Sequence, residues 1–198
     1  MLETISFKLP KPQLKVVQTP VPGCIELHPH IYGDARGQFL KVFHEPLWKQ
    51  LGLLTRFDEE FYSHSVQNVI RGFHFQKPPM QHTKVVFCVH GEVLDVVVDL
   101  RKGSPAFGTY YATRLSQQAG NILYIPEGLA HGFCVLSKEA TLYYKVTTVY
   151  SPLHESGILW NSAGVAWPVE NPVLSARDQK FPRLSEFDSP FQMKKYEE

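Results

Sequence analysis

The chain of 198 residues is long enough for one domain with a buried core and a cavity. Its 20 Lys and Arg residues nearly balance 19 Asp and Glu residues, which argues against broad electrostatic binding of nucleic acid or of an anionic membrane. Three widely separated cysteines favour a reducing compartment over a disulfide framework. Because no stretch reaches the length of a membrane span and the first residues lack the apolar segment of a signal peptide, we expect a cytoplasmic protein.

From the amino end, residues 1–22 predict an extended N-terminal arm, and short β-strands punctuated by Gly and Pro follow it. Strands are expected over residues 31–42, 68–75, 85–89, 93–100, 108–114, 122–125, 132–136 and 141–150. A short helix is expected over 46–53 and another after Ser175, where Ser175-Ala-Arg-Asp resembles a helix cap. Many short strands of this kind predict a mainly β sandwich or barrel, with one domain over 1–198.

The alternation of side chains along a strand predicts which residues share a face. Lys84 shares one face with Val86 and Cys88, and His90-Gly91-Glu92 then predicts a turn or a bulge. In the later strand, Tyr144 and Tyr150 share a face. If these faces line the interior of a barrel, Lys84 and the two tyrosines point into one cavity.

The segment RGFHFQKPPMQHTK, residues 71–84, concentrates basic and imidazole side chains, and it raises the question of a metal site. Gly120, Pro126, Gly128 and His131 match the second signature of the cupin double-stranded β-helix, a jelly-roll barrel. In the first signature, however, Lys84 holds the position of the ligand Glu, and an ammonium group repels a cation. This disfavours the ordinary cupin metal site. A zinc site made of His74, His82 and His131 stays open as an alternative.

Longer motifs resemble the family of nucleotide-sugar epimerases typified by dTDP-4-dehydrorhamnose 3,5-epimerase. They are IYGDARG (31–37), VIRGFHFQ (69–76), HTKVVFCVHGEVLDVVVDLRKGSPAFG (82–108), LYIPEGLAHGFCVLS (123–137), LYYKVTTVYSP (142–152), GILWN (157–161) and PVLSARD (172–178). The resemblance implies a cupin jelly roll with a few short helices. It also implies an isomerase that needs no cofactor and no metal, and that inverts C3, C5 or both in a 4-keto-6-deoxyhexose carried on a nucleoside diphosphate.

The resemblance also implies roles for particular side chains. His74 corresponds to the base, Asp178 to the carboxylate that orients it, and Lys84 to the group that stabilises the enolate oxygen. Tyr144 corresponds to the proton donor on the opposite face, a role for which we expect nearby positive charge to make the phenol more acidic. The resemblance further implies six substrate-binding residues. They are Arg36 and Arg71 at the pyrophosphate, Tyr32 and Tyr150 at the nucleotide and phosphate end, His131 in the pocket wall, and Glu59 near the nucleobase.

Three positions depart from the family pattern: Lys41 replaces an acidic residue, Glu59 replaces a Gln that contacts the nucleobase, and Phe61 replaces an Asn. These changes leave the nucleotide open among dTDP-, CDP-, GDP- and UDP-linked sugars, and a single-centre epimerase remains an alternative. A cupin that only binds a sugar nucleotide is an alternative from another class. The family pairs as a dimer, so we expect a homodimer to which residues 1–22 could contribute.

Overall fold

The computed structural model describes residues 14–193, in which thirteen strands outweigh one short α-helix. The strands are β1 (Leu14–Gln18), β2 (Ile25–Pro29), β3 (Ile31–Asp34), β4 (Gly37–Leu40), β5 (Glu59–Val66), β6 (Ile70–Gln76), β7 (Lys84–His90), β8 (Glu92–Asp99), β9 (Tyr110–Ser116), β10 (Ile122–Ile125), β11 (Leu129–Val135), β12 (Glu139–Val146) and β13 (Glu155–Gly157). The helical elements are α1 (Glu45–Gln50) and the 3₁₀ turns η1 (Asp178–Lys180) and η2 (Leu184–Glu186). Within residues 14–193, no helix has both the length and the apolar character needed to cross a membrane.

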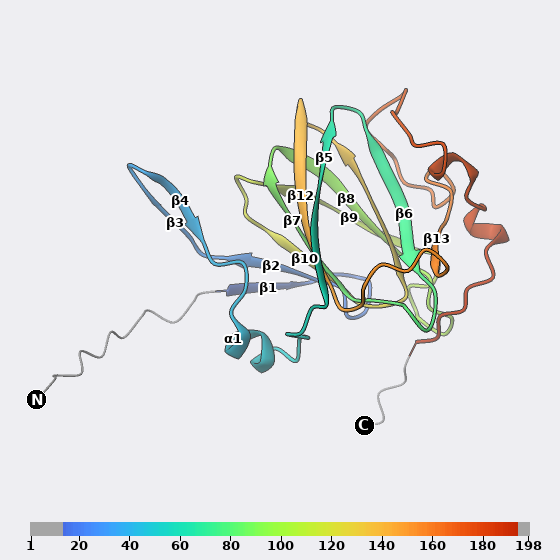
Figure 1. The fold of residues 1–198 in the computed structure, drawn as a ribbon, viewed down its shortest axis with the longest axis horizontal. Coiled ribbons are helices and arrows are strands. Elements are labelled where there is room, and N and C mark those ends of the chain that lie inside the picture. Colours follow the sequence, from blue (N-terminus) through green and yellow to red (C-terminus); the bar gives the residue numbers. More distant parts are fainter. Residues whose placement is uncertain (1–13, 194–198) are drawn as a thin grey trace, which may run out of the picture.

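Two antiparallel sheets form the body of the molecule (Figure 1). One has six strands in the order β1-β2-β10-β7-β12-β5, and the other has five in the order β13-β6-β11-β8-β9. Neighbours in each sheet are mostly distant in sequence, which is the connectivity of a jelly roll. The mainly β cupin fold predicted from sequence is therefore confirmed.

The core between the sheets follows directly from strand alternation. Val86 and Cys88 of β7 face inward with Leu142 and Tyr144 of β12, and they meet Phe133 of β11 from the other sheet. The opposite face of β7 carries Val85 and Phe87, which pack under α1. The predicted faces of this strand are confirmed. So is the turn after it, since Gly91 has φ of +76° and a Cβ there would lie 2.1 Å from the Glu139 carbonyl oxygen.

The C-terminal segment covers the outer face of the five-stranded sheet. Phe73 and Phe75 of β6 form an apolar cluster there with Phe191, against which Trp167 and Phe187 pack. In Figure 1 this segment, drawn in orange and red, runs beside β6 and β13. Its position brings residues from the last quarter of the chain close to the strand that carries His74.

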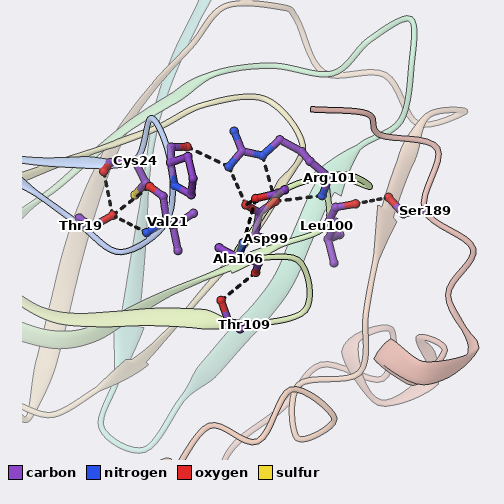
Figure 2. A network of polar contacts seen from close by, with 11 residues as sticks. Thr19, Val21, Cys24, Asp99, Leu100, Arg101, Ala106, Thr109 and Ser189 are labelled. Carbon is purple, nitrogen blue, oxygen red and sulfur yellow. Dashed lines mark hydrogen bonds and ion pairs between the residues drawn. The ribbon is translucent and has the colours of Figure 1, made fainter. Parts of the chain in front are cut away.

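A buried ion pair joins three separate segments at the end of β8. The Asp99 carboxylate accepts hydrogen bonds from Arg101 Nε at 2.9 Å and from Ser104 Oγ at 2.7 Å. Arg101 also donates to the Pro22 carbonyl at 2.8 Å, while Ser189 Oγ donates to the neighbouring carbonyl of Leu100 (Figure 2). Because the buried charges are paired and hydrogen-bonded, this network can hold the N-terminal loop and the C-terminal segment against the sandwich.

The structure differs from the sequence prediction in local detail. Residues 31–42 form the hairpin β3–β4 rather than one strand, because Asp34 Oδ1 accepts the Arg36 N–H at 2.8 Å and Gly37 takes φ of +124°. The segment after Ser175 makes only the 3₁₀ turns η1 and η2, although Ser175 Oγ does accept the Asp178 N–H at 3.0 Å. Strands β1, β2, β5 and β13 were not predicted. Residues 14–18 of the expected arm pair with β2 of their own chain, whereas residues 1–13 lie outside the described residues, so one domain over 1–198 stays a prediction.

Candidate active site

A cavity of about 360 Å³ lies between the two sheets, within the size range of small-molecule sites. Its lining includes Phe61, Lys84 and Tyr144 from the six-stranded sheet, and Arg71, His74 and His131 from the five-stranded sheet. Each of these side chains is placed by its strand, and the two sheets present them to one space from opposite sides. Five of the ten residues singled out from sequence are in this set, and two more, Tyr150 and Glu59, also line the cavity.

His74 and Asp178 form a hydrogen-bonded pair although they are far apart in sequence. His74 Nε2 lies 2.8 Å from Asp178 Oδ1, and the Gly72 N–H donates to Asp178 Oδ2 at 3.1 Å. Burial alone would raise the pKa of Asp178, but the hydrogen bond and charge of His74, followed by Gly72 and Ser175, lower it to about 2. The carboxylate is therefore ionised and accepts the Nε2 proton, which leaves the lone pair of the imidazole on Nδ1.

The environment keeps His74 neutral. Burial lowers the pKa of His74 below its ordinary value of 6.5, and the charges of Lys84 and Arg177 act in the same direction, while Asp178 opposes them. A neutral imidazole with an oriented tautomer is the form that can accept a proton.

Lys84 supplies a buried positive charge beside this pair. It is the first residue of β7, it is 9% exposed, and its Nζ donates to the His74 carbonyl at 3.2 Å. Burial lowers the pKa of Lys84 from 10.5 to about 8, with Asp95 and Glu155 opposing the shift. At neutral pH the ammonium form still predominates, so the cavity contains a poorly solvated charge that can stabilise a developing oxyanion.

Tyr144 lies on the opposite sheet from His74. Its hydroxyl is 3.4 Å from Ser63 Oγ, and its ring stacks on Phe61. Burial raises the pKa of Tyr144, and the lowering by Ser63 and by the charge of Arg71 is smaller. This differs from the expectation of a more acidic phenol: the site keeps the hydroxyl protonated, because burial outweighs the nearby positive charge.

A second His–Asp pair lies deeper in the cavity. His131 Nε2 is 2.8 Å from Asp95 Oδ2 and 2.9 Å from Oδ1, and both residues are buried. The His131 ring also meets Tyr144 edge-on, with 6.1 Å between ring centroids. Sequence reasoning missed Asp95, although a lone acidic residue inside the buried run of β8 was an available signal.

The rim of the cavity carries a chain of hydrogen bonds. Tyr150 donates its N–H to Glu59 Oε2 at 2.6 Å and its hydroxyl to Glu155 Oε2 at 2.7 Å. Arg177 donates to Glu155 Oε1 at 2.5 Å, and its NH2 lies 3.2 Å from His74 Nε2. Glu155 and Arg177 were missed in the sequence, although Arg177 directly precedes Asp178 in the matched PVLSARD motif.

Arg71 is an exposed guanidinium at the rim that faces the cavity. Its Nε donates to Ser65 Oγ at 2.9 Å and its NH2 to the His64 carbonyl at 3.3 Å. These bonds hold the planar group in place and leave other N–H donors for an anionic ligand.

Tyr32 and Arg36 do not join this cavity in the single chain. They lie on the β3–β4 hairpin, which projects away from the sandwich in Figure 1. The Arg36 side chain is 90% exposed and pairs with Asp34 at 2.6 Å. Within one subunit neither residue lines the cavity, because the chain leaves the sheet after β2 and returns only through α1. That both residues contact the substrate stays a prediction.

The three histidines considered for zinc do not form a metal site. His74 and His131 each direct Nε2 to their own carboxylate, and His82 Nδ1 lies 3.3 Å from Thr148 Oγ1. Across the described residues 14–193, no group of three or more His, Cys, Asp or Glu side chains is arranged to hold a metal ion.

Removing a proton from a carbon next to a ketone requires a neutral base, a cation near the oxygen, and an acid that can reach the other face. The two sheets provide these groups from opposite sides of one cavity. Fold and site together define an acid–base isomerase built on a jelly roll.

Comparison with known proteins identifies the family. Residues 18–186 match the family model described as dTDP-4-dehydrorhamnose 3,5-epimerase. The dTDP-4-dehydrorhamnose 3,5-epimerase of Shigella flexneri is 43% identical over 174 residues, which cover 85% of this chain and 96% of that protein.

Comparison with solved structures points to the same family. The dTDP-6-deoxy-D-glucose-3,5-epimerase of Legionella pneumophila, in complex with dTDP-4-keto-L-rhamnose, has a TM-score of 0.87 and 34% identity, covering 92% of this chain and all of that one. The Bacillus anthracis enzyme with TDP and PPi bound has a TM-score of 0.84 and 38% identity, covering 86% of this chain and 99% of that one. The chain belongs to the dTDP-4-dehydrorhamnose 3,5-epimerase family and is an epimerase, as its sequence motifs predicted.

Proposed function

We propose that the chain inverts C3 and C5 of dTDP-4-dehydro-6-deoxyglucose to give dTDP-4-dehydrorhamnose, using only its own side chains. The observation that carries the proposal is the 2.8 Å pair of His74 and Asp178 facing Tyr144 across the cavity. Family membership supports the reaction, and the related enzymes solved with dTDP-4-keto-L-rhamnose or with TDP support the nucleotide.

The mechanism begins with His74. Its Nδ1 takes a proton from C5 or C3, the electron pair of the broken C–H bond forms a double bond to C4, and the π pair of the carbonyl moves to the C4 oxygen to give an enolate. Asp178 stabilises the imidazolium, and the Lys84 ammonium stabilises the enolate oxygen. Tyr144 then donates its hydroxyl proton to the carbon from the other side, which inverts it and restores the C4 ketone. The His74 imidazolium afterwards releases its proton to solvent, and the Tyr144 phenolate takes one up.

Isotope exchange tests this function. Enzyme and substrate are incubated in D₂O, and NMR reports deuterium and configuration at each carbon, with dTDP-, CDP-, GDP- and UDP-linked sugars compared. We expect deuterium at C3 and C5 with the dTDP sugar, undiminished after exhaustive chelation. His74→Ala should abolish exchange, while His90→Ala, at an exposed histidine that ends β7, should not. Exchange that survives His74→Ala, or is absent with every sugar, overturns the proposal.

The proposed assembly is a homodimer in which each β3–β4 hairpin reaches the partner's cavity. The support is that Phe39 is 62% exposed on this hairpin and that Arg36 and Tyr32 lie away from their own cavity. Light scattering should give twice the mass of the chain. Mixing inactive His74→Ala with inactive Arg36→Ala protein should restore activity, since one of the two shared sites in a mixed dimer is then intact; no recovery would refute the shared site.

The proposed location is the cytoplasm. Its support is that Cys24, Cys88 and Cys134 are free and buried, as expected for a protein of a reducing compartment. Fractionation of the producing cells, with a known cytoplasmic enzyme as control, checks it.

A further inference from the structure

Phe61 lies flat against the phenol of Tyr144. The two residues face each other directly across the β5–β12 ladder, with 4.7 Å between ring centroids and 13° between ring planes. Phe61 lines the cavity and is 41% exposed, whereas Tyr144 is buried. A large apolar side chain so exposed on an edge strand contributes little to the core, so its contact with Tyr144 is the feature to explain.

Few other contacts direct the Tyr144 hydroxyl. Its separation from Ser63 Oγ is 3.4 Å, at the long limit for a hydrogen bond between two hydroxyls. On the inner side, the His131 ring meets Tyr144 edge-on, and Asp95 holds His131 through both carboxylate oxygens. His131, held by Asp95, therefore supports Tyr144 on the inner side, and Phe61 supplies the contact on the side of the open cavity.

The geometry of a phenol makes this contact important. The hydroxyl lies on the long axis of the ring, so flipping the ring about that axis does not move it. Tilting the ring does move it, and a parallel ring stacked on its face resists tilting. The loss of such a contact allows the proton donor to shift by a distance that matters for proton transfer.

We propose that Phe61 is a positioning residue that holds Tyr144 against the face of the enolate opposite His74, and so determines how often proton return inverts the carbon. The proposal rests on the proposed function, in which Tyr144 is the donor. The enolate has two fates. If the His74 imidazolium returns a proton to the face it came from, the carbon keeps its configuration; if the Tyr144 O–H bond breaks instead, a C–H bond forms on the other face and a phenolate remains for solvent to reprotonate.

The two fates are separable in D₂O. Once the His74 imidazolium has exchanged the removed proton with D₂O, deuterated substrate of unchanged configuration reports return from His74. Deuterated epimer reports donation by Tyr144, whose hydroxyl carries deuterium in D₂O. For Phe61→Leu we expect the ratio of retained to inverted deuterated sugar to rise roughly 2- to 10-fold, which is the range expected for losing one aromatic pair. Total exchange should stay within about twofold of wild type, because His74, Asp178 and Lys84 are untouched.

Matched variants separate positioning from other effects. Tyr62→Leu removes an aromatic ring from the next position of the same edge strand, where the side chain is 69% exposed, and should leave the ratio unchanged. Phe61→Tyr keeps the ring and should restore the wild-type ratio. Thermal unfolding of each variant confirms that the compared proteins are folded.

The outcomes distinguish this proposal from the proposed function. Tyr144→Phe should remove inversion while exchange with retention persists; if it inverts normally, the donor assignment fails, and the Phe61 proposal fails with it. If Tyr144→Phe behaves as expected but Phe61→Leu keeps the wild-type ratio, with or without a raised KM, the positioning role alone is refuted. A ratio that rises equally in Tyr62→Leu refutes it as well, because the effect then belongs to the strand.

Discussion

Lys84→Met tests the central electrostatic feature of the site. Lys84 is buried next to the imidazole–carboxylate pair, and burial lowers its pKa from 10.5 to about 8. At 1.36 kcal/mol per pKa unit, this difference corresponds to a cost of about 3 kcal/mol for keeping the ammonium charged inside the folded protein. Replacement by Met removes both the charge and its cost.

The sign of the pH dependence follows from proton uptake. Between pH 8 and pH 10.5 the unfolded chain still binds the Lys84 proton while the folded protein has released it, so unfolding takes up a proton. The unfolding free energy of wild type therefore rises with pH between pH 8 and pH 10.5, because the folded protein no longer carries the buried charge. Below pH 8 the full cost of burying the charge lowers the unfolding free energy. Lys84→Met lacks this dependence.

The assay is urea denaturation of wild type and Lys84→Met at pH 7 and at pH 10.5. The difference in unfolding free energy between the two proteins should change by about 3 kcal/mol in favour of wild type at the higher pH. The control is Lys145→Met, which removes an ammonium that lies outside the cavity, on the other face of β12, where it pairs with Glu60.

At pH 7, replacing Lys84 by Met should lower activity although it removes the cost of the buried charge. We expect kcat/KM of Lys84→Met at pH 7 to fall by roughly 10²- to 10³-fold, the usual effect of removing one oxyanion-stabilising group. In wild type, kcat/KM should decline above about pH 8 as the ammonium is lost. A stability difference that is equal at both pH values, or a variant with wild-type kcat/KM, would refute the reasoning.

Three further predictions concern the same fold. Asp178→Asn should lower kcat roughly 10³-fold in the exchange assay, because an amide no longer stabilises the imidazolium; a loss under tenfold contradicts this. Because burial lowers the pKa of His74, the acid limb of kcat/KM against pH should lie below 6.5, and a limb above that value would be inconsistent with a neutral buried base. Gly91→Ala should lower the unfolding free energy by about 2 kcal/mol or more in urea denaturation, since its Cβ would clash with the Glu139 carbonyl. Gly103→Ala, which has a similar φ of +83° and no atom within 4 Å of the added Cβ, is the control, and an equal loss in both would show that the clash is unimportant.

Local patterns predicted most of the strands whose two faces differ in chemistry or that are buried on both, but they missed β2, in which four of the five residues are buried. The faces of β7 followed from simple alternation, and the Gly91 turn followed from the one residue that accepts its backbone angles. Strand β5 was missed because it is an edge strand with polar residues on both faces, so its sequence EEFYSHSV shows no apolar period.

Part of the site could be predicted from the sequence, because its chemistry requires particular residue types. His74 and Asp178 could be paired in advance only through their motifs, since 104 positions separate them. Glu155 could not be recognised from local sequence, because an isolated charged residue outside the expected strands is normally solvated, and the only signal for Arg177 was its place beside Asp178 in PVLSARD. Their role became visible only when η1 and the segment after β12 were placed at the same rim.

The sequence by itself determined which side chains share a face in the strands it predicted, because this depends on short-range periodicity. Its motifs indicated the acid–base chemistry of the cavity through their resemblance to a family. Only the tertiary structure decided that Asp95 supports His131, that the Tyr144 phenol is kept protonated, and that the hairpin bearing Arg36 lies away from its own cavity. The physical reason is that burial, pKa and mutual orientation depend on which distant segments pack together, and this is not encoded in any short stretch of the chain.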